Sequence, residues 1–189
     1  MNTLNITKAD IDEHGYYKAS GSIRFDGHVE IDADLGSVRV RGELHATGRV
    51  RALAGSGIKA GWGIEAGEGI EAGSGIKAGW GIEAGSGIEA GEGIEAGSGI
   101  KAGWGIKAGW GIEAGLSIAA KFVVSPLRIF AGLCLWRLPT AAECEIRAEV
   151  RQGTVAHGLV VLPQGVQVAG GKEPATPERA QSGKEPTDA

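Results

Sequence analysis

Between residues 55 and 114 the chain repeats one pattern of apolar and polar positions every six residues. The ten consecutive hexads read GSGIKA, GWGIEA, GEGIEA, GSGIKA, GWGIEA, GSGIEA, GEGIEA, GSGIKA, GWGIKA and GWGIEA. A fixed hexapeptide period is typical of β-helices, in which each repeat supplies one short strand and one corner. Alternation within each Ile-x-Ala triplet predicts that Ile64 and Ala66 point inward while Glu65 points to water.

The Gly-x-Gly segments between the triplets are expected to form the corners. A chain that turns every six residues needs backbone with positive φ or positions with no room for a Cβ atom, and glycine supplies both. Three hexads make one coil of 18 residues if the cross-section is triangular. Ten hexads then give a little over three coils, stacked about 4.8 Å apart around a column of isoleucines.

On the N-terminal side, residues 20–54 keep short alternating strands punctuated by glycine. The positions expected to point inward are Val29, Ile31, Ala33, Leu35, Val38, Val40 and Leu44. These residues predict roughly two further, degenerate coils. Residues 1–19 are expected to form an N-terminal cap, because a bare first coil would expose an unpaired strand edge.

On the C-terminal side, the regular array of residues 55–120 gives way to an apolar run and then to a second alternating segment. Residues 121–169 are therefore expected to form terminal coils and a C-terminal cap, with Phe130 and Trp136 in an apolar plug. Residues 170–189 have no apolar run and three prolines, and are expected to be disordered. The predicted fold is all-β: a single-stranded β-helix, or β-solenoid, of about 18 residues per coil, capped at both ends.

Composition and charge narrow the class of protein only slightly. The chain has 34 glycines among 189 residues and a formal net charge of −4. That charge argues against direct, sequence-specific binding to nucleic acid. Cys134 and Cys144 lie in apolar or alternating segments, which favours reduced, buried thiols in a cytoplasmic protein. The longest apolar stretch is interrupted by Arg137 and is too short for a membrane helix.

Candidate residues for catalysis or cofactor binding are few. Cys134, Cys144 and His157 are the nearest approach to a nucleophile and base, and their setting favours packing over catalysis. The four histidines lack the spacing of zinc ligands, and the repeated G-x-G is not followed by the helix that a phosphate-binding loop requires. The sequence therefore predicts a protein that is not an enzyme and has no cofactor.

Two resemblances follow from these segments. Residues 21–51, with G-x-I and G-x-V strands, loosely resemble the bactofilin type of polymer-forming β-helix. The whole arrangement of degenerate entry strands, GxGIxA hexads and the closing segment LSIAAKFVVSPLRIFAGLCLWRLP is similar to small solenoid proteins carried by phages and mobile elements. The second resemblance implies a bacterial host cytoplasm and a role in disarming host defence or adjusting host machinery, and it implies no catalytic residues.

The tryptophans are the main candidates for a binding surface. Trp62, Trp80, Trp104 and Trp110 fall at the centres of Gly-x-Gly corners, where a side chain must point away from the coil. A coil of 18 residues stacks Trp62 on Trp80 and places the other two on different corners. Exposed tryptophan is common at interaction hot spots. Two interpretations stay open, selection for binding and duplication of one chance tryptophan.

The charged positions predict a column on each side of the array. The columns read Lys59, Lys77, Glu95, Glu113; Glu65, Glu83, Lys101; and Glu71, Glu89, Lys107. The first coils are acidic on two sides, through Glu65, Glu83, Glu71 and Glu89, which suits a partner with a basic surface. In the entry coils Asp26, His28, Glu30, Asp32 and Asp34 suggest either a cation site or, as we favour, a ladder of ion pairs with nearby arginines.

These observations predict a non-catalytic binding protein, a monomer or small oligomer, that occupies a host protein or nucleoprotein complex. Inhibition of an antiviral defence such as a CRISPR effector or a restriction enzyme fits this prediction. The alternative is a structural protein that polymerises end to end, as the bactofilin-like segment would suggest. A third and more distant alternative is a solenoid enzyme that processes sugars.

Overall fold

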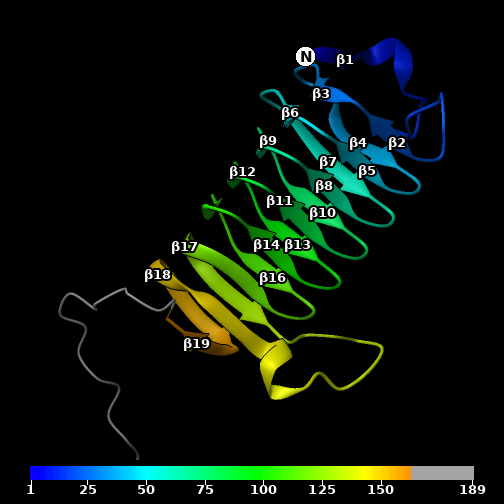
Figure 1. Cartoon of the computed structure of the whole chain (residues 1–189). Coiled ribbons are helices and arrows are strands. Elements are labelled where there is room, and N and C mark those ends of the chain that lie inside the picture. Colours follow the sequence, from blue (N-terminus) through cyan, green and yellow to red (C-terminus); the bar gives the residue numbers. More distant parts are fainter. Residues whose placement is uncertain (163–189) are drawn as a thin grey trace, which may run out of the picture.

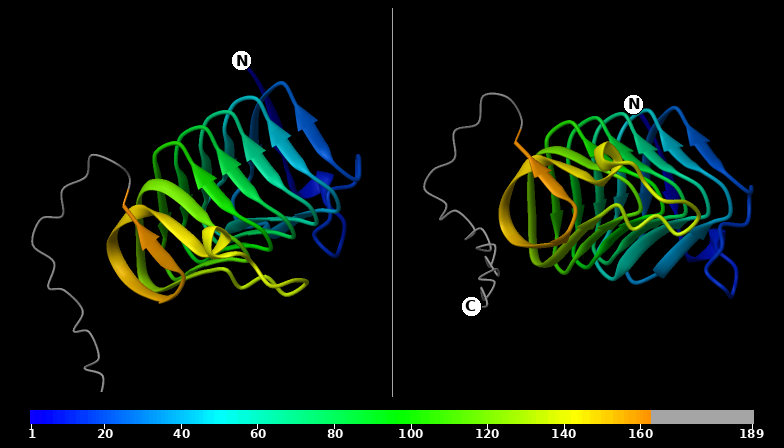
Figure 2. Two further views of the ribbon diagram at one scale, coloured as in Figure 1. Left: turned by 60° about the horizontal axis from the view of Figure 1, so that its bottom comes forward. Right: turned by 90° about the horizontal axis from the view of Figure 1, so that it is seen from below.

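In the computed structural model, which describes residues 1–162, the chain winds into a parallel β-solenoid of about eight coils. Figure 1 and Figure 2 show the coils stacked along one axis, and the strand pairings divide each regular coil into three sides. In the regular coils each strand pairs with the strand 18 residues further on, as when Ile82 pairs with Ile100. The predicted β-solenoid is therefore confirmed, and the tail expected at residues 170–189 lies outside the described residues.

Each side of the solenoid is one parallel sheet, and we call these sheets face 1, face 2 and face 3. Face 1 consists of β2 (Ile23–Phe25), β5 (Leu44–Ala46), β8 (Ile64–Ala66), β11 (Ile82–Ala84), β14 (Ile100–Ala102), the first residues of β17 (Ile118–Ala131) and β18 (Glu145–His157), and β19 (Leu159–Val161).

Face 2 consists of β1 (Asn2–Ile6), β3 (Gly27–Ile31), β6 (Val50–Ala52), β9 (Ile70–Ala72), β12 (Ile88–Ala90), β15 (Gly105–Ala108) and the middle of β17 and β18. Face 3 consists of β4 (Gly36–Val40), β7 (Ser56–Ala60), β10 (Ile76–Ala78), β13 (Ile94–Ala96), β16 (Ile112–Ala114) and the last residues of β17 and β18.

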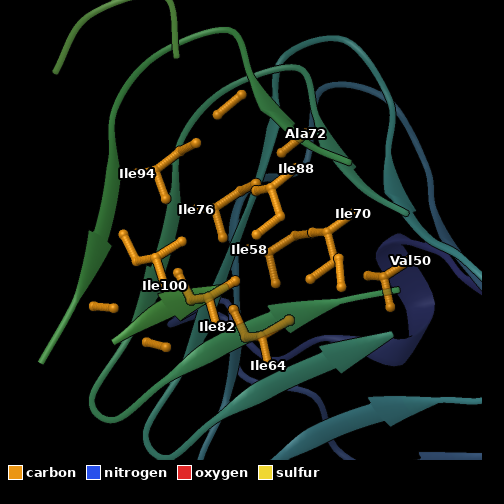
Figure 3. Close-up of a cluster of buried hydrophobic side chains, with 14 of the residues drawn as sticks. Val50, Ile58, Ile64, Ile70, Ala72, Ile76, Ile82, Ile88, Ile94 and Ile100 are labelled. Atoms are coloured by element: carbon orange, nitrogen blue, oxygen red, sulfur yellow. The ribbon is translucent and has the colours of Figure 1, made fainter. Parts of the chain in front are cut away.

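The core is a set of stacked isoleucine columns, as the alternation predicts. Every isoleucine of the ten hexads is at most 1% exposed, and the alanine of each triplet is also buried. Figure 3 shows Ile64, Ile82 and Ile100 in one column beside the columns from the other faces. Because each inward side chain packs on its equivalents one coil away, the core stays continuous along the whole array.

The corner glycines are needed for lack of space rather than for positive φ. Among the hexads only Gly55 has a left-handed φ, of 72°. A Cβ atom added to Gly79 would lie 2.1 Å from the carbonyl oxygen of Gly61 in the preceding coil. At Gly81, which ends the same corner, the nearest atom would be 3.4 Å away. At this corner the first glycine is therefore required sterically, and the second is not.

The N-terminal segment closes the first coil. Strand β1 pairs with β3 and is itself part of face 2, and the 3-10 helix η1 (Lys8–Asp10) follows it. Ile11 is 3% exposed and packs against the core. Gly15 and Tyr17 make backbone hydrogen bonds with Arg39 of β4. Residues 1–19 thus cover the starting edges of face 2 and face 3.

Three positions outside the regular array differ from expectation. Ala33 is exposed, because residues 32–35 form a turn between face 2 and face 3 instead of continuing the strand. Phe130 pairs with the outward residue Glu113 and lies half-buried on the outside of face 3. Trp136 is 58% exposed. The expected plug of Phe130 and Trp136 is therefore wrong, while a cap that includes residues 163–169 lies outside the described residues.

Candidate functional site

The four corner tryptophans form no part of the core. Their exposed fractions are 59% for Trp62, 66% for Trp80, 57% for Trp104 and 59% for Trp110. Backbone hydrogen bonds link equivalent corner positions from coil to coil, so each corner is a straight column. Trp62 and Trp80 share the corner between face 3 and face 1, and Trp104 and Trp110 lie on the other two. The predicted placement is confirmed.

The indoles of Trp62 and Trp80 stack on one another along the axis of the solenoid. Their ring centroids are 6.4 Å apart and their planes differ by 25°. The next residues in this column, which we call the Trp62 corner, are Ser98 and Leu116. Two successive large side chains are thus followed by a small one, and the stack of corner indoles ends at Ser98.

A groove runs beside the Trp62 corner along face 1. Its volume is about 760 Å³, with Trp62 and Trp80 on one border and the outward residues Glu65, Glu83 and Lys101 on the other. Arg24 and Glu43 lie at its N-terminal end, and Arg147 lies at its C-terminal end. The sheet beneath has its backbone groups paired from strand to strand. The groove therefore offers side chains, rather than free backbone, for recognition.

Three of the four candidate glutamates have a cationic neighbour one coil away, and Glu65 has a histidine neighbour. Glu83 lies 2.5 Å from Lys101, and the hydrogen bond between them raises the pKa of Lys101 above its usual range. Glu65 lies 3.3 Å from His45, which is charged when protonated. The remaining two pairs are Arg51 with Glu71 at 3.3 Å and Lys107 with Glu89 at 3.5 Å. The acidic surface expected from the sequence is therefore largely compensated within the ladder.

Within that ladder two like-charged steps remain. Glu65 is directly paired with Glu83 on face 1, and Glu71 with Glu89 on face 2. Like charges directly opposite on neighbouring strands are mildly destabilising. The pair on face 1 lines the groove beside the stacked indoles, whereas the pair on face 2 lines a smaller hollow near Trp104.

Trp104 differs from the stacked pair because its ring already has intramolecular partners. The Lys121 ammonium lies 4.2 Å from its ring centroid, and Phe122 meets it edge-on at 6.4 Å. Phe122 is 7% exposed and sits over Gly105, where an added Cβ atom would clash with the ring. Trp104 therefore helps to cover an irregular coil, which is a structural role.

Trp110 borders a second apolar hollow of about 680 Å³ at the corner between face 2 and face 3. Pro126, Leu127 and Phe130 of β17 line the same hollow. Leu127 follows Trp110 in the corner column and is 58% exposed. This corner thus carries an apolar pair near the C-terminal coils, whereas the stack of Trp62 on Trp80 lies near the N-terminal coils.

Sequence reasoning missed the loop of residues 132–144, which projects from the Trp62 corner between β17 and β18 (Figure 1). Its Trp136 ring lies against Gly97, one coil beyond Trp80. Leu135 and Leu138 are 97% and 93% exposed. No local pattern marks this contact, since it joins segments about 40 residues apart; the departure from hexads after residue 120 was the only available signal.

An ion pair closes this loop next to the 3-10 helix η2 (Ala141–Cys144). The Arg137 guanidinium donates two hydrogen bonds to Glu143, at 2.8 and 2.5 Å, and Thr140 donates two more. The hydrogen bond from Arg137, followed by those from Thr140, lowers the pKa of Glu143 to about 2. The carboxylate is therefore ionised at neutral pH and holds the base of the loop.

The acidic cluster of the entry coils is not a single face. His28 and Glu30 lie on β3, Asp26 lies at the corner before it, and Asp34 lies in a turn with a φ of 58°. Asp26 accepts a hydrogen bond from Thr47 at 2.8 Å, and the His28 imidazole accepts one from the backbone of Arg49. Among residues 1–162 Glu30 has no ion pair, because Arg51 turns to Glu71 instead. In the described residues no ion pair joins this cluster to an arginine, so the favoured ladder is wrong here.

Other chemistry in the described part of the chain is sparse. In residues 1–162 no group of three or more His, Cys, Asp and Glu side chains is arranged to hold a metal ion. Cys134 and Cys144 are half-buried, unpaired thiols, and the His157 ring contacts the backbone oxygen of Ala131. None of the helices in this part has the length and apolar character needed to cross a bilayer.

Comparison of the chain with protein-family models, with curated proteins and with solved structures gave no match.

Proposed function

We propose that this protein is a non-catalytic binding protein of phage or mobile-element origin, which occupies and inhibits a host protein or nucleoprotein complex. The origin rests on the resemblance of its hexad array to solenoid proteins of such elements. The binding role rests on one observation: two stacked, exposed indoles border a groove of about 760 Å³. Large exposed aromatic surface beside a groove is typical of interaction hot spots.

The regular repeat restricts where a partner can be recognised. Inward positions are committed to Ile and Ala, and the first glycine of each corner is sterically required. Only the centre of each corner and the outward position of each triplet vary among the hexads. On the Trp62 corner and face 1 these positions hold Trp62, Trp80, Glu65 and Glu83, and all four line the groove.

One step of the groove, between Glu65 and Glu83, favours a partner that presents a cationic side chain beside an apolar one. Glu65 and Glu83 are neighbours in register, so a cation placed between them would relieve their repulsion. The same cation would lie beside the Trp80 indole, which attracts cations to its face. Basic, grooved surfaces of this kind occur on proteins that handle nucleic acids, and an antiviral effector or restriction enzyme is such a target.

The proposal is tested by co-purification from a bacterial host that carries the target. A tagged wild-type chain is expected to retain one host complex in a fixed ratio. The variant Trp62→Ser/Trp80→Ser is expected to lose it while keeping its melting temperature, because Ser98 already occupies the next position of this corner. Trp104→Ser is the matched control, since Ser86 precedes Trp104 on its corner, and it should retain the complex. Equal retention by all three proteins would contradict the proposal.

A second candidate function, end-to-end polymerisation, is favoured by one observation. In the described chain, residues 149–157 of β18 pair with β17 on one side and with no strand on the other. Leu159 and Val160 of the final strand are also 59% and 40% exposed. The opposite end is covered by residues 1–19, so contact between like ends alone would give a dimer, and a polymer would also require the N-terminal end to open. Filaments in negative-stain micrographs of the purified protein would support this candidate, and a single small species would reject it.

A further inference from the structure

We propose that face 3 is a self-association surface, on which a second copy of this chain binds in antiparallel orientation. This inference goes beyond the proposed function, because the outward charges of face 3 do not line the groove on face 1; the two surfaces share the Trp62 corner. It rests on three observations about face 3: the order of its charges, the two charges of its regular coils that have no ion-pair partner among residues 1–162, and the sizes of the side chains along its two corners.

The outward charges of face 3 reverse sign once, at the middle of the regular array. Lys59 pairs with Lys77, Lys77 with Glu95, and Glu95 with Glu113, so the column reads two cations followed by two anions. Only Lys77 and Glu95 form an ion pair with one another. In the described part of the chain Lys59 and Glu113, at the two ends of the column, have no ion-pair partner.

We place a two-fold axis in the plane of face 3, perpendicular to the solenoid axis and midway between Lys77 and Glu95. Because the charges change sign at this point, the axis brings cations of one copy opposite anions of the other. It places Lys77 opposite Glu95 of the second copy and Lys59 opposite Glu113, and it repeats both contacts by symmetry. A two-fold axis along the solenoid would instead place every residue opposite its own equivalent, cation against cation. Charge complementarity therefore selects the antiparallel arrangement.

The corners that border face 3 are complementary in size under the same axis. On the Trp62 corner, Trp80 comes opposite Ser98 of the second copy, and Trp62 comes opposite Leu116. On the other corner, Trp110 comes opposite Ser56, whose side chain is fully buried. Each of these corner indoles therefore meets a smaller corner residue of the second copy.

The loop of residues 132–144 adds apolar surface at the same place. Trp136 lies against Gly97, in the same coil as Ser98, and so faces Trp80 of the second copy. Faces 1 and 2 lack this match. Their columns read Glu65, Glu83, Lys101, Ala119 and Glu71, Glu89, Lys107, Val124, and each gives one opposite-charge contact where face 3 gives two.

We expect a dimer with a micromolar dissociation constant, because each strand of face 3 contributes only one outward side chain and stable interfaces bury about 800 Å² per partner. Added salt should weaken the dimer, since its cross-contacts are exposed ion pairs. Because Trp62 and Trp80 border both the groove and face 3, a host partner that covers these indoles would compete with the second copy.

Charge reversal on face 3 tests the proposal by sedimentation velocity, over about 1 to 500 µM protein. The wild type should dimerise within this range. Lys59→Glu/Lys77→Glu makes the column entirely acidic, and Glu95→Lys/Glu113→Lys makes it entirely basic. Each variant alone should raise the dissociation constant at least tenfold, and an equimolar mixture of the two should form a heterodimer.

The fourfold variant Lys59→Glu/Lys77→Glu/Glu95→Lys/Glu113→Lys is the decisive control, because it keeps the net charge and restores a self-complementary order. It should dimerise like the wild type. Glu71→Lys/Glu89→Lys on face 2 should leave dimerisation unchanged. Circular dichroism and melting temperature verify that each variant is folded. A wild type that stays monomeric, a dimer indifferent to the two-residue variants, or a folded but monomeric fourfold variant would each overturn the proposal.

The outcome is separable from that of the proposed function. Loss of the dimer through the charge variants of face 3 should not reduce capture of a host complex, because these variants leave Trp62 and Trp80 unchanged. Binding of the host complex by the acidic and basic variants is therefore measured in parallel with their sedimentation.

Discussion

The indoles of Trp62 and Trp80 lie one coil apart on a single corner, with ring centroids 6.4 Å apart and both more than half exposed. A parallel solenoid brings them together because each coil repeats the position of the last. The stack therefore depends on the backbone conformation of the corners.

The two glycines of one corner should respond differently to the same substitution. Gly79→Ala forces a Cβ atom to within 2.1 Å of a backbone carbonyl oxygen, so the coils must separate locally. We expect a loss of about 2–4 kcal/mol in the free energy of unfolding. Gly81→Ala, with 3.4 Å available, should cost less than about 1 kcal/mol. Chemical denaturation of both variants checks this, and equal losses would contradict the steric account.

A charge placed in the isoleucine column should destabilise the whole array. Ile82 is 1% exposed and packs between Ile64 and Ile100. Ile82→Asp buries a carboxylate with no cation within the column, and we expect a loss of roughly 3–5 kcal/mol. Ile82→Val, the control, should cost about 1 kcal/mol. An unchanged melting temperature for the aspartate variant would show that the inward assignment is wrong.

The loop that carries Trp136 should loosen in acid. Hydrogen bonds from Arg137 and Thr140 lower the pKa of Glu143 from 4.5 to about 2 in the folded protein. The stabilisation is therefore fully present above pH 4.5 and is lost as the pH falls towards 2. The fluorescence of Trp136, in a variant that keeps it as the only tryptophan, should change over this range. The same protein with Glu143→Gln should show no such transition, and a transition of equal size would refute the assignment.

The regular array was predictable from sequence because its six-residue period determines which residues lie inside, at the corners and outside. The hexads place Ile82, Trp80 and Glu83 on the inside, the corner and the outside, and the structure has them there. Pairing one coil later also put Trp62 on Trp80 and gave the three charge columns. The hexads could not indicate why each glycine is needed. Gly79 and Gly81 occupy similar positions in the sequence, and they differ only in the distance to the backbone of the neighbouring coil.

The irregular coils were predicted in outline and missed in detail. After residue 120 the register slips, so that Ile112 pairs with Ile129 and Gly105 comes under the ring of Phe122. Such slips depend on the fit of particular side chains and not on a period. Trp136 is the most important omission, because an apolar run predicts burial, and only the folded chain shows this residue on the outside against Gly97.

The central claim is that the Trp62 corner and the groove beside it form the surface that binds the host partner. The most direct test is the affinity of the purified wild type and of Trp62→Ser/Trp80→Ser for the partner retained by the wild type, measured by calorimetry on proteins of equal melting temperature. We predict that the double variant binds at least tenfold more weakly, a loss of about 1.4 kcal/mol or more. Equal affinities for the two proteins would contradict the claim and would show that the partner binds elsewhere on the protein.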